Sequence, residues 1–254
     1  MRFIPKRSTI GTAVLFLMVT AQPRCGGVEY FGPTSVPTQT QAFATNRSLP
    51  SEDSRGESLF SMSTRAFFKL SQVNQRMDMQ NLNHTLLSAA VFHETNQRRQ
   101  EYGRTRLDHL PRLDEAARIH AQSMARYDYL SHTNPRQRNL RTPGDRLKAV
   151  GLKPSYYAEN VATHFGIQYE SGTPVYRTER RGETQYSYNP GGPPIPRHTY
   201  RSFAESLLDQ WMRSSGHRGN ILSGDPEFLG AACEMGGKKK GMYEFYCAQV
   251  FFAR

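Results

Sequence analysis

Cysteines and histidines are the residues of this chain with the widest range of chemistry. The sequence has three cysteines and eight histidines. Three cysteines allow one disulfide and leave one thiol over. Cys233 and Cys247 lie close together near the C-terminal end of the sequence, and we expect a disulfide between them if the chain is exported to an oxidising compartment. Cys25 is then the remaining thiol.

Nucleophilic catalysis finds little support in the sequence. No Gly-x-Ser-x-Gly motif occurs, and a cysteine held in a disulfide is no nucleophile. Histidine can instead bind a divalent cation or transfer a proton. His120 stands in an alanine-rich stretch that we expect to be a helix, where its side chain either packs or is partly exposed. The sequence indicates no partner for four other histidines: His93, His109, His164 and His198.

The charge and the polarity of the chain limit its partners. Lys and Arg number 33 against 22 Asp and Glu, so the net charge is +11, and the hydrophobic content of 37% excludes a multi-span membrane protein. The longest basic run is the three lysines at 238–240, and no nucleic-acid-binding motif is present. Nucleic acid is therefore not an expected partner. The basic excess serves either solubility or affinity for an acidic envelope surface.

The first 21 residues have the pattern of a signal peptide. Basic residues come first, an uncharged and mostly apolar stretch follows over 9–21, and Val19-Thr20-Ala21 places small residues at a cleavage site. The apolar stretch is too short to span a membrane, so we expect no transmembrane span after cleavage. The signal-peptide pattern therefore predicts that the chain is secreted or located in the cell envelope. Lipid attachment at Cys25 is the alternative, although Arg24 stands where such sites have a small residue.

A polar tail is expected to separate the signal peptide from a folded domain. Residues 22–83 are rich in Pro, Thr, Ser and Gln, and over 22–56 no periodicity predicts structure. Apolar residues at 58–78 recur every three or four positions, which predicts a helix. That helix either docks on the domain or frays in solution. From about residue 86 to residue 254 the sequence is typical of a folded domain.

Helices precede strands in this domain. Apolar stripes predict helices starting near residues 87, 113 and 203, and the stretches 228–235 and 242–252 have the composition of strands. This order lacks the alternation of a parallel α/β sheet and favours an α+β fold with an antiparallel sheet. Between these blocks, residues 166–200 are rich in Pro, Gly and Tyr. This composition favours a disordered loop, with a binding role for its tyrosines as the alternative.

The order of several short motifs identifies a family. Together they resemble the CAP superfamily, also called the SCP domain, which includes cysteine-rich secretory proteins, antigen 5 and pathogenesis-related plant proteins, and the chain is most similar to its compact bacterial members. The resemblance covers about residues 86–254. The motifs are His93-Glu94-Thr95-Asn96, Ser131-His132-Thr133, Gly144-Asp145-Arg146-Leu147, Ala158-Glu159-Asn160-Val161, Trp211-Met212-Arg213-Ser214-Ser215-Gly216-His217 and Gln249-Val250-Phe251.

The resemblance implies a fold and a site. The fold is a three-layer α-β-α sandwich with a mainly antiparallel sheet, in which Cys233 and Cys247 bridge the last two long strands. The site is a cleft in which His132, Glu159 and His217 match the family's residues. His132 and His217 could hold a divalent cation such as Zn²⁺, with open positions for water, and Glu159 could accept a proton from that water.

One departure from the family pattern affects the mechanism. A second glutamate follows the third-helix tryptophan in the eukaryotic members, but here Met212-Arg213-Ser214 follows Trp211. Asp209 is the better substitute by position, and Glu205 lies further away. The missing acid weakens any mechanism that needs two carboxylates.

Three functions are compatible with these observations. The first is a secreted, non-catalytic module that binds a ligand or partner, such as a lipid or another envelope component, through the cleft and the 166–200 loop. The second is a metal-dependent protease or esterase that uses His132, Glu159 and His217 as catalytic residues. The third is a structural envelope protein that is held by its tail and its basic charge and would tolerate loss of the cleft. Independently of these functions, the alternative for His132, Glu159 and His217 is a hydrogen-bonded polar cluster that ties loops together. The missing second acid favours the first function over the second.

Overall fold

The computed structural model describes residues 16–17, 54–180 and 182–254, which divide into two compact units. Of the described residues, 54–168 and 196–254 form the larger unit, and 16–17 and 169–195 form the smaller one. Apart from 16–17, the predicted signal peptide at 1–21 lies outside the described residues, as does the part of the predicted tail at 22–53 with Cys25.

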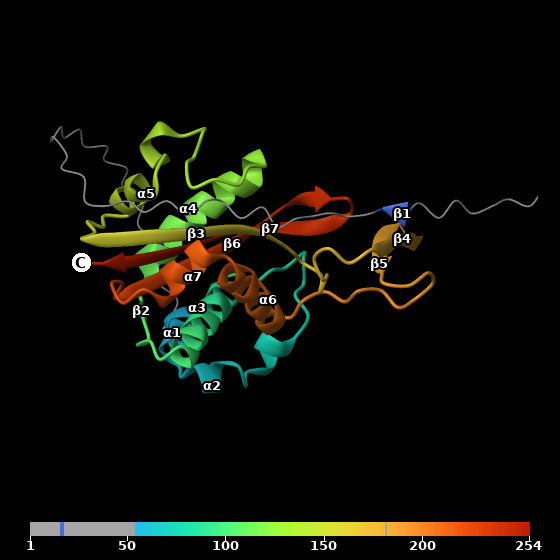
Figure 1. The fold of residues 1–254 in the computed structure, drawn as a ribbon, viewed down its shortest axis with the longest axis horizontal. Helices are drawn as coiled ribbons and strands as arrows, with labels where there is room; N and C mark the ends of the chain where they lie inside the picture. The colour runs from blue at the N-terminus through green and yellow to red at the C-terminus, as the bar shows by residue number, and fades with distance from the viewer. Residues whose placement is uncertain (1–15, 18–53, 181) are drawn as a thin grey trace, which may run out of the picture. The chain divides into compact units, whose positions relative to one another are not determined.

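A four-stranded sheet forms the centre of the larger unit. Its strands lie in the order β2-β6-β7-β3, so the last strand of the sequence is an inner one (Figure 1). β6 and β3 pair antiparallel with β7, whereas the short β2 pairs parallel with β6. The predicted α+β class with a mainly antiparallel sheet is confirmed. The bounds are β2 (Asp108–His109), β3 (Tyr156–Phe165), β6 (Phe228–Lys239) and β7 (Met242–Ala253).

Helices cover both faces of this sheet and give the predicted three layers (Figure 1). One layer holds α4 (Pro111–Tyr127), the short helix η2 (Arg138–Leu140) and α5 (Pro143–Ala149). The opposite layer holds α1 (Ser54–Ser61), α2 (Thr64–Phe67), η1 (Ser71–Asn74), α3 (His84–Glu101), α6 (Tyr200–Arg213) and α7 (Ser215–Leu222). Within the described residues, every helix falls short of the length and apolarity that crossing a membrane requires.

Local sequence signals explain where the helices begin and which face they bury. At the start of α6, the Thr199 side chain accepts from the Ser202 N–H while the Ser202 side chain binds the Thr199 backbone, which satisfies N–H groups at the helix end. Pro111 occupies the first turn of α4, where no N–H is needed. The predicted apolar stripe of α6 is buried against the sheet: Phe203, Ala204, Leu207, Leu208 and Trp211.

Gly230 allows α4 to lie close to the sheet. A Cβ atom at this position in β6 would lie 2.5 Å from backbone atoms of Leu113 and Asp114, at the start of α4. Backbone atoms cannot move aside as a flexible side chain can, so only glycine fits here. The Asp114 carboxylate accepts from the N–H of the next residue, Ala231, at 2.8 Å, which fixes the helix on the strand.

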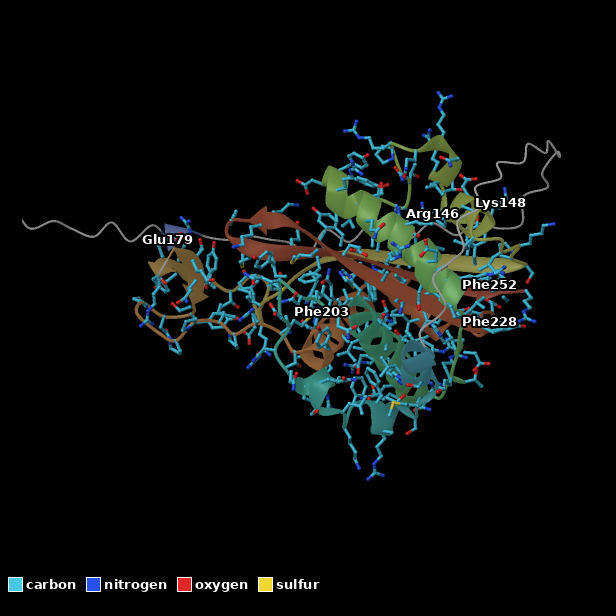
Figure 2. All side chains as sticks on the ribbon, turned by 180° about the vertical axis from the view of Figure 1, so that it is seen from behind. Arg146, Lys148, Glu179, Phe203, Phe228 and Phe252 are labelled. Carbon is cyan, nitrogen blue, oxygen red and sulfur yellow. A yellow bond between two sulfur atoms is a disulfide. The ribbon has the colours of Figure 1, made fainter. Side chains whose placement is uncertain are left out.

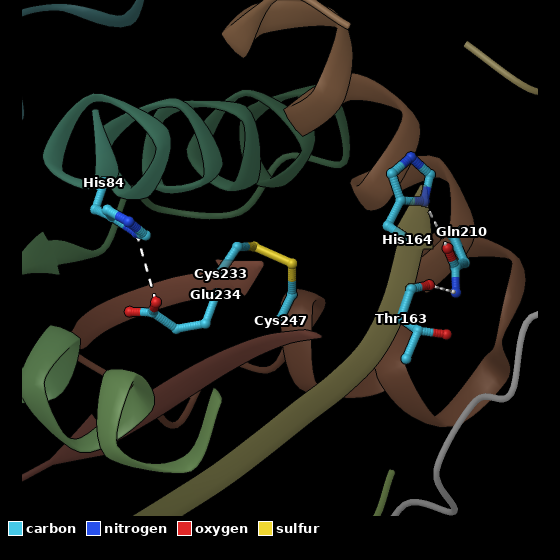
Figure 3. The surroundings of a disulfide bond; sticks show 7 residues. All are labelled: His84, Thr163, His164, Gln210, Cys233, Glu234 and Cys247. Atoms are coloured by element: carbon cyan, nitrogen blue, oxygen red, sulfur yellow. Dashed lines mark hydrogen bonds and ion pairs between the residues drawn. A yellow bond between two sulfur atoms is a disulfide. The ribbon is translucent and has the colours of Figure 1, made fainter. Parts of the chain in front are cut away.

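The predicted disulfide is present between the two long C-terminal strands. Cys233 of β6 and Cys247 of β7 are directly opposite each other in the antiparallel register and are bonded. Figure 3 shows the bridge between the two strands, and both residues belong to the apolar core that includes α3. The bridge is buried and has a structural role.

The segment that precedes α3 is part of the packed unit. Six of its side chains are buried in the core: Phe60, Phe67, Phe68, Val73, Met77 and Met79. The His93 ring stacks on Phe67 with centroids 4.2 Å apart, and its Nε2 lies 2.8 Å from the Leu59 carbonyl. The Met77 N–H donates to the His198 carbonyl at 2.8 Å. The domain start near residue 86, placed from the sequence, therefore lies inside the packed unit.

The smaller unit contains an antiparallel hairpin within the stretch 166–200. Its strands are β4 (Val175–Arg180) and β5 (Glu183–Ser187), and β1 (Phe16–Leu17) pairs antiparallel with β4. Gly182 provides the positive φ of 77° in the turn. The middle of the predicted insertion thus has regular structure, which differs from the disordered loop that its composition favours, because cross-strand pairing is not visible in composition.

Candidate functional site

A buried cluster of charged side chains lies between β3 and the α4–α5 layer. His132 Nδ1 is 2.9 Å from Glu159 Oε1, and Arg146 donates to Glu159 Oε2 at 2.6 Å. Because the carboxylate can only accept, His132 must carry its proton on Nδ1. All three residues are at most 4% exposed. We name His132, Arg146, Glu159 and the neighbouring His120 the charged cluster.

The electrostatics of the cluster keep Glu159 ionised. Burial alone would raise the pKa of its carboxyl group, but the positive charge of Arg146, the neighbouring His120 and the hydrogen bond from His132 together lower that pKa to about 2. Each oxygen of the carboxylate faces a donor. A carboxylate held this way is stabilised as an anion and has little tendency to take up a proton near neutral pH.

His120 completes the cluster from α4. Its Nε2 lies 2.7 Å from the Ser131 carbonyl oxygen and 3.9 Å from Glu159 Oε1. Burial lowers the pKa of His120 to about 4, so the ring is neutral at pH 7. The packing role expected for this residue is confirmed, since it is fully buried, but its position beside Glu159 was not expected.

Arg146 organises the loop that carries His132. Its guanidinium donates to three backbone carbonyls of that loop, at distances of 3.1 to 3.2 Å: those of His132, Leu140 and Arg141. The arginine itself is held in α5, whose first turn is fixed by a capping box between Thr142 and Asp145. One buried cation therefore sets both the charge of Glu159 and the course of the loop.

On β3, consecutive side chains point to opposite faces of the sheet, so Asn160 lies on the other face from Glu159. Asn160 Nδ2 donates to the His217 carbonyl at 3.2 Å and to Gln249 Oε1 at 3.1 Å, the latter from the residue directly opposite on β7. Asn160 Oδ1 accepts from Asn220 at 2.8 Å, and Asn220 also donates to the Glu159 carbonyl at 3.3 Å. This amide network ties α7 to the sheet.

The sequence-predicted residues thus lie in two connected places. His132 and Glu159 are in direct contact, whereas the backbone of His217, a fully buried residue of α7, is joined to β3 through Asn160. A shared cleft for His132 and His217 stays a prediction. The sequence analysis did not assign a role to Arg146, although the Gly-Asp-Arg-Leu motif that contains it was available as a signal.

The two acids before Trp211 have other partners. Asp209 accepts from Arg98 of α3 at 2.9 Å, and its side chain is 52% exposed. Glu205 forms an ion pair with Arg201, one turn earlier in α6, at 2.7 Å. Asp209 therefore serves the contact between α3 and α6, and its role as a substitute for the second family glutamate stays a prediction.

The donors present do not fit a three-ligand zinc site. Among the residues that the structure describes, no group of three or more His, Cys, Asp or Glu side chains could hold a metal ion. Both oxygens of Glu159 are engaged by His132 and Arg146, and a carboxylate bonded to Nδ1 orients an imidazole rather than binding the metal itself. A two-imidazole site of His132 and His217 stays a prediction.

The chain is similar to one protein family and to two solved structures. The model of the cysteine-rich secretory protein family, CAP, matches residues 92–251. Among solved structures, an extracellular SCP-domain protein from Bacillus anthracis is 22% identical with a TM-score of 0.45; the match covers 67% of this chain and 41% of that one, so this chain spans less than half of its length.

A second solved structure, an outer surface protein from Borrelia burgdorferi, is 14% identical with a TM-score of 0.36 over 65% of this chain and 90% of that one. A search of curated proteins finds no match.

Proposed function

Because the chain belongs to the CAP family of cysteine-rich secretory proteins, we propose that it is an exported, non-catalytic module that binds a ligand or partner beside its charged cluster. The disulfide between Cys233 and Cys247 supports export, since such bonds persist in oxidising compartments. The partner class that we propose is a component of the cell envelope such as a lipid, which an exported chain would encounter.

The buried ion pair between Glu159 and Arg146 is the observation that carries the non-catalytic assignment. A general base works best when its pKa lies near the operating pH, whereas the pKa of Glu159 is about 2. Taking up a proton would also break its ion pair with Arg146 at 2.6 Å. Glu159 therefore serves as the fixed counter-ion of Arg146 and not as a base that activates water.

The same cluster makes the adjoining loop suitable for binding. The loop backbone is fixed by Arg146 at three carbonyls, and the Asn134 N–H donates across the loop to the Arg141 carbonyl at 2.8 Å. A loop held in one conformation loses little entropy when a partner binds. The role of the cluster is thus to present a rigid surface.

A turnover assay tests this proposal against the metal-dependent hydrolase. Wild type, Glu159→Gln and His217→Ala would be assayed on peptide and ester substrates with and without divalent cations. We expect no turnover that depends on either residue. His84→Ala is the matched control, because the His84 side chain is 49% exposed at the start of α3. Metal-dependent hydrolysis that Glu159→Gln and His217→Ala abolish, and His84→Ala retains, would establish the hydrolase instead.

Calorimetry tests the predicted zinc site separately. Two imidazole ligands make an incomplete site, so Zn²⁺ should bind weakly to wild type, and less well as the pH falls and the imidazoles protonate. His132→Ala and His217→Ala should each remove this binding, with His84→Ala as the control. Identical isotherms for wild type and both variants would exclude these residues as ligands.

A further inference from the structure

Positive charge is concentrated in one part of the larger unit. Between residues 129 and 158 the sequence has six Lys or Arg residues and a single acid, Asp145. Two of these seven charged groups are used internally, since Arg146 pairs with Glu159 and Asp145 caps α5. The other five are exposed and lie between α4 and α5, on α5, or just after it: Arg136, Arg138, Arg141, Lys148 and Lys153. We name these five residues the basic face; Figure 2 shows the side chains of this layer, with Arg146 and Lys148 labelled.

Side chains of α4 extend this face. An Arg112 guanidinium nitrogen lies 3.5 Å from the Gly151 carbonyl oxygen, next to the end of α5. At the other end of α4, Arg126 is also exposed. The neighbouring acid Asp128 pairs with Lys239 at 2.7 Å, and the same lysine also pairs with Glu244 at 2.6 Å. The exposed basic residues named here outnumber Asp128, so the net charge of this part of the surface stays positive.

An exposed aromatic ring lies within this positive region. Tyr127 is 40% exposed, and its ring has the guanidinium groups of Arg126 and Arg136 within 5.6 and 5.5 Å of its centroid. Among the described residues, the large apolar side chains that are exposed are Tyr127 and Tyr102. Tyrosine flanked by basic residues suits the boundary between lipid headgroups and acyl chains, where one end of the ring is apolar and the other is hydrated.

We propose that the basic face, together with Tyr127, docks the protein on an anionic phospholipid surface. Arginine matches phosphate geometry with its planar fork of donors, and the exposed loop and helix α5 present these cations from adjoining elements of one rigid layer. The proposal depends on the proposed function only for export, which brings the chain to an envelope membrane. It does not depend on whether the charged cluster turns over a substrate.

The expected strength of binding to anionic vesicles follows from the number of basic side chains that contact the membrane. A basic side chain near an anionic membrane strengthens binding by about fivefold, so three of them contribute about 100-fold. The variant with Arg136, Arg138 and Arg141 all changed to Gln should therefore bind anionic vesicles about 100-fold more weakly than wild type. Their side chains are exposed, so the fold should be retained, and far-ultraviolet circular dichroism would verify this.

The experiment is sedimentation of the exported form of the chain with vesicles of phosphatidylcholine, with or without phosphatidylglycerol. The matched control changes Arg65, Lys69 and Arg104 to Gln, which removes the same charge from exposed positions in the opposite layer. We expect wild type and control to bind the phosphatidylglycerol vesicles with closely similar affinity, and more weakly as salt rises. Vesicles of phosphatidylcholine alone should bind little of either protein.

Three results would overturn the proposal. Equal losses in the two triple variants would mean that net charge, and not this face, determines binding. Equal binding of wild type to both kinds of vesicle would remove the anionic requirement. Binding to inorganic polyphosphate through the three arginines, without binding to vesicles, would make the partner a soluble polyanion. A positive turnover assay would contradict the proposed function and leave these vesicle results unaffected.

Discussion

Replacing Arg146 by methionine removes the cation that keeps Glu159 ionised inside the protein. The methionine side chain retains much of the arginine's bulk, so the main change is the loss of charge and of the hydrogen bonds to Glu159 and the loop. Arg146 and Glu159 are both nearly fully buried. Removing one partner of a buried ion pair leaves the other charge uncompensated and costs about 3–5 kcal/mol of stability.

The lowered pKa of Glu159 indicates how strongly its surroundings together favour the ionised carboxylate. Its folded value of about 2 lies below the ordinary value of 4.5, and at about 1.4 kcal/mol per pKa unit the ionised form is favoured by about 3 kcal/mol. This contribution is fully present above pH 4.5 and is lost as the pH falls toward 2. It is therefore constant between pH 7 and pH 5.

In the Arg146→Met variant, by contrast, the contribution of Glu159 to stability should change between pH 7 and pH 5. With the arginine gone, burial dominates and raises the pKa of Glu159 above its ordinary value. A raised pKa destabilises the protein at neutral pH, and this penalty shrinks as Glu159 takes up a proton at lower pH. The stability difference between wild type and variant should therefore be about 3–5 kcal/mol at pH 7 and clearly smaller at pH 5.

Urea unfolding followed by tryptophan fluorescence measures this difference. Trp211 is the single tryptophan and is fully buried, so its emission reports unfolding. Lys148→Met, an exposed position in the same helix, is the control and should cost less than about 0.5 kcal/mol. Changing Arg146 and Glu159 together to methionine should restore most of the lost stability. The reasoning fails if Arg146→Met costs no more than Lys148→Met, or if its cost is the same at both pH values.

Three further predictions concern the fold. Mass spectrometry of a non-reduced digest of the exported protein should find Cys233 linked to Cys247; two free thiols there would contradict the bridge. A chain that begins at Leu86 should be molten or insoluble, whereas one that begins at Ser54 should unfold cooperatively, because the first lacks the buried side chains before α3; equal cooperative unfolding of the two would refute this. Gly230→Ala should cost at least about 1–3 kcal/mol in urea unfolding, because its Cβ would meet the α4 backbone at 2.5 Å; a neutral effect would contradict that contact.

The parts of the fold that could be predicted depend on short-range patterns. The stripe that starts at Phe203 lies on α6, and the two C-terminal apolar stretches form β6 and β7, because helical and strand periodicities are properties of neighbouring residues. The family resemblance then supplied the three layers. Neither source needed a contact between residues far apart in the sequence.

In the segment before α3, short-range patterns were not sufficient to predict the structure. Its apolar spacing predicts one helix over 58–78, but the structure has the short helices α1, α2 and η1 there. Ser63 interrupts the run, because its side chain accepts from the Ala66 N–H and starts a new helix. The choice between docking and fraying depends on His93 and Phe67, whose stacking is a tertiary contact.

The candidate site could be predicted only in part, because several of its contacts join residues that are far apart in the sequence. The contact between His132 and Glu159 followed from the resemblance, but the burial of Arg146 did not, since arginine is usually exposed and its partner is 13 residues away in sequence. The pairing of Asn160 with Gln249 is set by the register of β3 on β7. Register is a property of the assembled sheet, so it required the structure.

The strand order has a consequence for how the protein is made. β7 lies between β6 and β3, yet it follows both of them in the sequence. Until β7 emerges from the ribosome, β3 has no neighbour in the sheet and the halves of the core on either side cannot close, so we expect the larger unit to fold only after β7 is made. For the export proposed above, a chain that has not yet folded is the form that can be threaded through a narrow pore. A stop codon that removes β7 would delete an inner strand and leave a product for proteolysis.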